Sequence, residues 1–304
     1  MSQKSFTDTA QIDLSYLIFF LLKKWKVFIV SLILCFVIFS IISLNLTKIW
    51  TSDALLVESG GAGNSQSQGT ASIVANLTGV NLGGSGSDVL ITLKRRVGTK
   101  DFFKILIEDE LVYKNLFAVS GYDETTKTNI YNTDIYDPEK SQWLARPTFF
   151  DAYRKYRSIV KSGFMDETVG DFLVIKAEHV SPISAKFIVD AVIFRMNELK
   201  RSEDIKEADS MLAYLETELV QTNQINIKSA INSLIENQIK TKTFANAKSD
   251  YLVKKIDSAY VPEQRSKPRR AYFVIISTII FEFILVFFFI LLAIYKSIQN
   301  EKKA

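Results

Sequence analysis

Two apolar stretches decide the fold: VFIVSLILCFVIFSIISLNL at residues 27–46 and AYFVIISTIIFEFILVFFFILLAIY at residues 271–295. A helix needs about 20 predominantly apolar residues to cross the hydrocarbon core of a bilayer, which is about 30 Å thick. The polar side chains of the first stretch are uncharged, and Glu282 is the one ionisable carboxyl group in the second. Both stretches are therefore predicted to be transmembrane helices, which excludes a wholly soluble protein.

The flanks of these stretches predict the topology. Trp25 and Trp50 bracket the first stretch at the interface depths that indole rings prefer, and the stretch exceeds the apolar region of about 7–15 residues in a cleaved signal peptide. An even number of spans leaves both tails on one side, and the tails are rich in lysine: Lys4, Lys23, Lys24, Lys26, Lys296, Lys302 and Lys303. We expect an uncleaved anchor, cytoplasmic tails at 1–26 and 296–304, and an extracytoplasmic domain at 47–270. In a Gram-negative cell this is a multi-pass protein of the bacterial inner membrane with a periplasmic domain.

Composition excludes several kinds of function. The net charge is +4, from 37 basic and 33 acidic residues, and no long Lys/Arg tract is present, so nucleic acid is not an expected partner. The single cysteine, Cys35, lies in the first apolar stretch, and His179 is the single histidine. A disulfide within the chain, a thiolate metal site and a multi-histidine metal site are thereby excluded. We expect no catalytic residues, cofactor or metal.

Glu282 lies near the middle of the second predicted span. A carboxylate there costs on the order of 2.5–3.5 kcal/mol on insertion scales, so it should not face lipid as an anion. We predict an intramembrane polar contact across the helix pair, with Ser31, Ser40 or Asn45 as partners. The alternative is a proton or ligand site, which would need a relay partner.

The first part of the loop domain alternates between regular and irregular segments. Residues 49–58 predict a strand, and eight of the 12 glycines follow at 60–86, where no Gly-Lys-Ser/Thr supports a phosphate loop. Amphipathic helices are predicted at 88–97 and 99–117, then a loop at 118–147 in which Trp143 packs down as an anchor. Thr148 and Asp151 have capping-box spacing and open another helix.

A strand pair and a long helical region complete the domain. Residues 159–165 and 172–178 predict a hairpin, and His179 at its end is interpreted as a packing or capping residue without a functional role. No glycine or proline interrupts 184–259, where apolar residues recur at helical spacing. A break is expected at 221–226, and this leaves two alternatives for the region, namely two long helices or a helical hairpin. The narrow apolar stripe needs neighbouring helices, and we favour a homo-oligomer over a closed bundle within one chain. The predicted fold class is α+β.

A basic, proline-containing strap, YVPEQRSKPRR at 260–270, leads into the second stretch. Pro262 and Pro268 stop helix formation. Four basic side chains are placed to meet anionic headgroups, which ordinary interfacial anchoring explains equally well: Arg265, Lys267, Arg269 and Arg270.

Taken together, these features resemble the Wzz-type chain-length determinants, or polysaccharide co-polymerases. The resemblance is carried by IDLSY at 12–16 with KKWK at 23–26, by the predicted hairpin at 166–178 with Ser181, Pro182 and Ala185, and by QIKTKTFANA at 238–247, DSAYVP at 257–262 and KP at 267–268. The proline segment before the second span is the most specific part: Pro262, Lys267, Pro268 and Arg269. The glycine-rich segment at 60–86 departs from the family pattern.

The resemblance implies an inner-membrane homo-oligomer of about eight copies, with a membrane-proximal α/β base and long extended helices. It implies a non-enzymatic regulator of the chain length of O-antigen, lipopolysaccharide or a related surface glycan. The implied partners are a Wzy-type polymerase and undecaprenyl-diphosphate-linked glycan. Some relatives carry or recruit a cytoplasmic tyrosine kinase; the nine residues after Tyr295 cannot hold one, so such a kinase is at most a partner.

Three alternatives remain at this point. The capsule or exopolysaccharide export scaffolds of the same superfamily share the architecture. A receptor would need a signalling output, which the short tails do not offer. A glycan-cleaving enzyme would need two carboxyl groups about 5–10 Å apart, and no spacing in the sequence singles out a pair.

Overall fold

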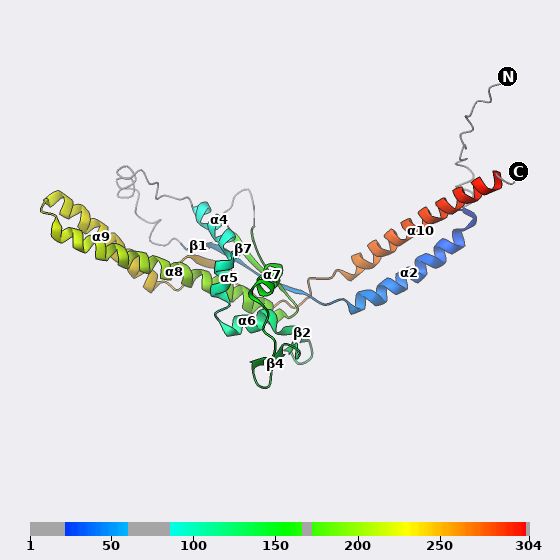
Figure 1. Cartoon of the computed structure of the whole chain (residues 1–304), viewed down its shortest axis with the longest axis horizontal. Coiled ribbons are helices and arrows are strands. Elements are labelled where there is room, and N and C mark those ends of the chain that lie inside the picture. The colour runs from blue at the N-terminus through cyan, green and yellow to red at the C-terminus, as the bar shows by residue number, and fades with distance from the viewer. Residues whose placement is uncertain (1–21, 60–85, 166–171, 302–304) are drawn as a thin grey trace, which may run out of the picture. The chain divides into compact units, whose positions relative to one another are not determined.

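The computed structural model describes residues 22–59, 86–165 and 172–301 (Figure 1). The chain forms two compact units. One combines the two ends of the chain, Met1–Lys48 and Ser266–Ala304, and the other is Ile49–Arg265. Most of the glycine-rich segment at 60–86, and the predicted turn at 166–171, lie outside the described residues.

The first unit is a pair of apolar helices, α2 (Trp25–Asn45) and α10 (Arg270–Glu301). They run antiparallel, because Phe28 near the start of α2 stacks edge-on against Phe289 in the second half of α10, with ring centroids 5.4 Å apart. Their mean hydropathies are 3.1 and 2.9, and only 11% of each apolar window is buried. Helices thus occupy both predicted stretches. Both are long and apolar enough to cross a membrane, and their low burial distinguishes them from the core helices of a soluble protein.

The second unit is built on a four-stranded antiparallel sheet in the order β6-β7-β1-β8. Its strands are β1 (Trp50–Glu58), β6 (Val160–Phe164), β7 (Leu173–His179) and β8 (Val253–Asp257). Every second residue of β1 is buried from Trp50 to Leu56, and β7 alternates likewise. One face of the sheet therefore carries the core, and the predicted strands at 49–58, 159–165 and 172–178 are confirmed.

Short capped helices surround an aromatic core: α4 (Gly86–Val97), α5 (Lys100–Leu106), α6 (Glu110–Phe117) and α7 (Phe149–Ile159). The side chain of Thr148 accepts a hydrogen bond from the Asp151 N–H, which confirms the predicted cap. The single helix predicted at 99–117 is wrong. Asp109 accepts a hydrogen bond from the Leu111 N–H and starts a new helix, so that α5 and α6 both turn buried phenylalanines inward.

The predicted loop at 118–147 contains two small hairpins, which corrects that prediction. They are β2 (Val119–Asp123) with β3 (Thr128–Tyr131), and β4 (Tyr136–Asp137) with β5 (Gln142–Trp143). Trp143 lies edge-on against the rings of Tyr113 and Tyr136, at 5.0 and 5.1 Å between centroids. The predicted anchoring of this loop by Trp143 is confirmed.

A long helical hairpin projects from the sheet, formed by α8 (Pro182–Gln221) and α9 (Ile225–Ala247) (Figure 1). The break at Thr222–Gln224 falls where the sequence predicted it. The first half of α8 packs on β1 and β7 through fully buried residues such as Ile188 and Val192. The second half packs against α9, so a helix from the same chain supplies part of the cover that the apolar stripe needs.

The helix predicted to continue to residue 259 ends at Ala247, because polar side chains of α8 form hydrogen bonds with the backbone that follows α9. The side-chain oxygen of Asn197 accepts hydrogen bonds from the N–H groups of Leu252 (2.7 Å) and Val253 (3.0 Å), and its amide donates to the Val253 carbonyl (3.2 Å). Arg201 donates to the carbonyls of Lys248 and Ser249. These bonds turn the chain into β8, so residues 253–257 form a strand, which corrects the prediction of a helix there.

Replacing Asn197 with alanine should destabilise the larger unit by about 2–4 kcal/mol, because it leaves two buried N–H groups and a carbonyl without partners. Asn197 is 4% exposed. Urea unfolding of the full-length protein in detergent, followed by circular dichroism, measures the change. Asn246→Ala is the matched control, because Asn246 is exposed and bonds only within its own helix, to the Lys242 carbonyl. Equal losses in both variants would contradict the role of Asn197.

Candidate functional site

The residues of the predicted proline motif lie in two different environments, one buried and one exposed. Pro262 is buried in the larger unit, where the strap is held by a 2.7 Å hydrogen bond from the Ser52 hydroxyl to the Tyr260 carbonyl. Lys267 and Arg269 are exposed immediately before α10. The Arg269 guanidinium lies 5.9 Å from the centre of the Tyr272 ring. Pro262 therefore has a packing role in this structure, whereas the positively charged side chains of Lys267 and Arg269 lie on the surface. The functional role of the motif stays a prediction.

The predicted polar contact of Glu282 is not formed by hydrogen bonds within the described residues. Its Oε1 atom is buried without a hydrogen-bond partner. Ser40 and Asn45 instead donate to carbonyls of their own helix, Phe36 O at 2.7 Å and Ile41 O at 3.2 Å. No hydrogen bond joins Ser31 to Glu282 in this part of the chain. The intramembrane polar contact of Glu282 stays a prediction.

His179 is enclosed at the end of β7. It is 4% exposed, and its Nδ1 accepts a hydrogen bond from the Ser181 N–H (3.2 Å), which fixes the neutral ring. Burial, together with the nearby charge of Lys155, lowers the pKa of His179 to about 4. The neighbouring Ser181 hydroxyl donates to Asn129 and its residue is fully buried, so it is closed to a substrate. The interpretation of His179 as a packing residue is consistent with this geometry.

The shifted pKa values of the described carboxyl groups reflect mostly hydrogen bonds and ion pairs. Among those with a shifted pKa, only Glu58 is raised, by desolvation at the end of β1. The Glu203 carboxylate is held by the Arg96 guanidinium, which lowers its pKa. Burial would raise the pKa of Asp190, but hydrogen bonds from Lys186 and Lys255 outweigh it and lower the pKa. Carboxylates held in ion pairs are suited to stabilising the fold rather than to proton transfer.

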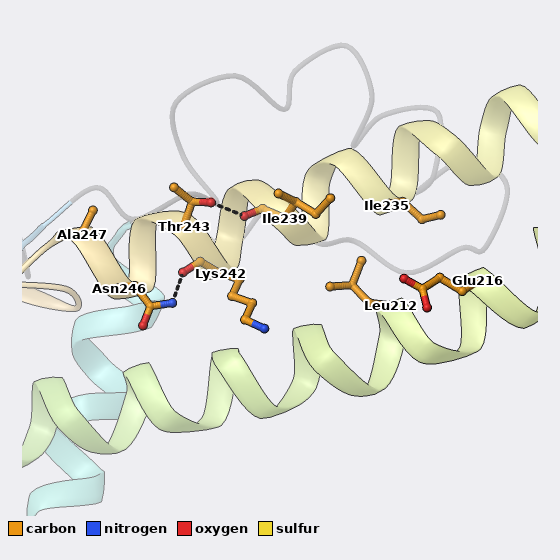
Figure 2. Close-up of a pocket in the computed structure, with 8 residues that line it drawn as sticks. All are labelled: Leu212, Glu216, Ile235, Ile239, Lys242, Thr243, Asn246 and Ala247. Atoms are coloured by element: carbon orange, nitrogen blue, oxygen red, sulfur yellow. Dashed lines mark hydrogen bonds between the residues drawn. The ribbon is translucent and has the colours of Figure 1, made fainter.

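A groove of ≈ 680 Å³ runs along the helical hairpin of the larger unit (Figure 2). Figure 2 shows Leu212 of α8 and Lys242 of α9 pointing into the space between the two helices. The Lys242 ammonium pairs with Asp209 on α8 at 2.7 Å. The lining is completed by Glu216, Ile235, Ile239, Thr243, Asn246 and Ala247. This groove is amphipathic and offers apolar area beside fixed charges, as a protein-binding surface does.

Apolar side chains are also exposed around the hairpin. Val220 and Ile225, which flank its tip, are both 83% exposed. Further along, the exposed apolar residues are Met211, Tyr214, Ile227, Ile239 and Phe244. A water-facing hairpin with this many uncovered apolar groups is typical of an interaction surface.

Within the described residues, no group of three or more His, Cys, Asp or Glu side chains is arranged to hold a metal ion. Sequence reasoning missed the hairpin groove, because it depends on which faces of α8 and α9 meet. It also missed the Arg96–Glu203 and Lys242–Asp209 pairs, whose members are distant in the chain.

Comparison with known proteins finds similar chains among solved structures. Neither a family model nor a curated protein matches the sequence. Among solved structures, a full-length bacterial polysaccharide co-polymerase is similar over 92% of this chain and 97% of its own length, with 12% identity and a TM-score of 0.34. A fragment of WzzB, a polysaccharide co-polymerase from Salmonella Typhimurium, is similar over 73% of this chain and 100% of its own, with 14% identity and a TM-score of 0.32.

His179→Asn should flatten the pH dependence of stability between pH 7 and pH 5. The unfolded chain binds a proton on histidine near pH 6.5, whereas the folded protein does so only near pH 4, so the native state loses stability as the pH falls through this window. The loss attributable to His179 is about 2 kcal/mol. Asparagine can still accept the Ser181 bond but does not titrate.

The measurement is urea unfolding of the full-length protein at several pH values. The pKa values of Asp190 and Glu203 are lowered in the folded protein, so these two groups change the stability with pH only below this window. A wild-type stability that is unchanged from pH 7 to pH 5 would contradict the buried, neutral histidine.

Proposed function

We propose that this protein is a non-enzymatic regulator of polysaccharide chain length in the bacterial inner membrane. The observation that carries the proposal is an α+β domain with a long helical hairpin, bracketed by two apolar helices that pack on each other. The strap with Pro262 and Pro268 adds the sequence resemblance to Wzz-type proteins. The substrate would be O-antigen, lipopolysaccharide or a related surface glycan.

The proposed topology has both tails in the cytoplasm and the domain at 47–270 in the periplasm. The lysines before α2 support it, since basic residues next to short tails favour the cytoplasmic side. Arg269 and Arg270 sit at the other interface, at the start of α10. Basic side chains there can snorkel to lipid headgroups, so they do not contradict the orientation.

The protein is proposed to act as a homo-oligomer, with about eight copies as the resemblance implies. Support comes from the hairpin, because Val220, Ile225 and the other exposed apolar side chains remain uncovered when the chain is alone. Burying them between copies would gain about 25 cal/mol for each Å² of apolar surface removed from water. An assembled ring of domains would present its surfaces to a Wzy-type polymerase and to lipid-linked glycan.

No catalytic step is assigned to this chain. A regulator of this kind acts through binding, so it needs contact surfaces rather than an acid–base pair. A cytoplasmic tyrosine kinase remains a proposed partner of the tails.

Deleting the gene should convert a modal band of surface and lipid-linked glycan into a short, unregulated ladder, and restoring the gene should recover the band. Gel electrophoresis of both glycan pools measures this. Unchanged chain lengths with glycan retained inside the cell would instead indicate an export scaffold. No change in either pool would contradict both functions.

Replacing Val220 and Ile225 together with serine should weaken the oligomer without destabilising the monomer, because both side chains already face water. Native mass spectrometry of the full-length protein in detergent should show a shift towards smaller assemblies. The matched control is the double change of Leu111 and Leu144 to serine, since these leucines are 53% and 61% exposed outside the hairpin. Wild-type assembly in the hairpin variant would contradict the proposed interface.

A further inference from the structure

The pair of apolar helices contains a second groove, of ≈ 360 Å³, where the end of α2 meets the start of α10. Phe36, Ser43 and Leu44 line it on α2, and Arg270, Val274 and Ile275 line it on α10. Nearly all of this lining is hydrocarbon. Arg270 is therefore the one cationic side chain among the residues that line this mostly apolar groove.

Arg270 is placed so that its charge is not neutralised by acidic neighbours. It is the first residue of α10, and the first turn of that helix contains no acidic residue. The guanidinium donates from Nη2 to the Leu44 carbonyl at 3.2 Å, while its Nε atom is buried without a hydrogen-bond partner. The free N–H groups of a helix N-terminus add partial positive charge at the same place.

Ser43 is the second polar group in the groove that lacks a partner. Its residue is 2% exposed, and its hydroxyl makes no hydrogen bond. Ser40, which also lines the groove, instead donates to the Phe36 carbonyl of its own helix. Leaving a buried hydroxyl unpaired costs roughly 1–3 kcal/mol, which a bound acceptor would recover.

We infer that this groove binds the phosphate of a membrane lipid, with the lipid chain along Phe36, Val274 and Ile275 and the phosphate at Arg270 and Ser43. Arginine presents a fork of donors that matches phosphate oxygens, and the serine hydroxyl supplies one more. The apolar lining favours a lipid over a free phosphate ion, because an inorganic ion would leave that surface uncovered. The inference rests on the proposed membrane placement of α2 and α10 and is independent of the chain-length role.

Native mass spectrometry of the full-length protein in detergent tests the site. The probes are a polyprenyl phosphate, the matching polyprenol without phosphate, phosphatidylglycerol and inorganic phosphate. We expect the phosphate-bearing lipids to be retained, and retention to fall about tenfold in Arg270→Gln and a few-fold in Ser43→Ala. Arg270→Lys keeps the positive charge but loses the paired donors of the guanidinium, so its lipid retention should be intermediate. An intermediate retention shows that the loss in Arg270→Gln is not due to misfolding.

Arg269→Gln is the matched control, because Arg269 is the adjacent residue and does not line the groove. Equal losses in Arg269→Gln and Arg270→Gln would overturn the site in favour of diffuse attraction. Equal retention of the uncharged polyprenol, or of inorganic phosphate alone, would also overturn it.

Preference between polyprenyl phosphate and phosphatidylglycerol identifies the lipid source, and both outcomes support a lipid-phosphate site. The glycan ladder of the Arg270→Gln strain is scored separately. Lost lipid retention with a wild-type ladder would keep this site and separate it from chain-length control. Wild-type lipid retention with an altered ladder would overturn the site and leave the proposed function standing.

Discussion

The larger unit depends on the backbone pairing of β1 with two strands that are far away in the chain. β1 follows α2 after a few residues and pairs with β7 on one side and β8 on the other, and β8 leads into the strap before α10. The Ser52–Tyr260 hydrogen bond extends this association beyond the last paired residues. The chain therefore begins and ends this domain on neighbouring strands. A domain inserted between two apolar helices that pack on each other needs its first and last segments to lie close together, and the pairing of β1 with β8 provides this.

A second set of contacts holds the domain together at the hairpin root, which is the base of α8 and α9 next to the sheet. Asn197 and Arg201 bind the returning backbone, and Tyr251 donates to Asp204 at 2.7 Å, so several side chains hold the base of α8 and α9. Beyond this root the two helices cover each other only in part, and their outer faces expose apolar side chains. The hairpin therefore offers a long, partly apolar surface for contact with other molecules.

The sequence predicted the strongly periodic elements well and the short ones poorly. Both apolar helices, the strands of the sheet up to β7, the helix break at Thr222–Gln224 and the cap at Thr148 were predicted from local signals. The break at Asp109 was missed because the apolar spacing of 99–117 continues through it. The hairpins at 119–143 were missed because their strands are short and polar. The end of α9 was missed because the signal lies in Asn197 and Arg201, about 50 residues earlier.

The sequence by itself determined that this chain has two helices able to span a membrane, an α+β domain between them, and no disulfide within the chain or multi-histidine metal site. These properties follow from the length of apolar runs, local periodicity and residue counts. Only the tertiary structure decided which strands are neighbours, that α8 pairs with α9, and that Ser43 and Arg270 share one groove with unpartnered polar atoms. Such facts depend on contacts between residues up to about 230 positions apart, and hydrophobic periodicity specifies which face of an element is buried but not which partner covers it.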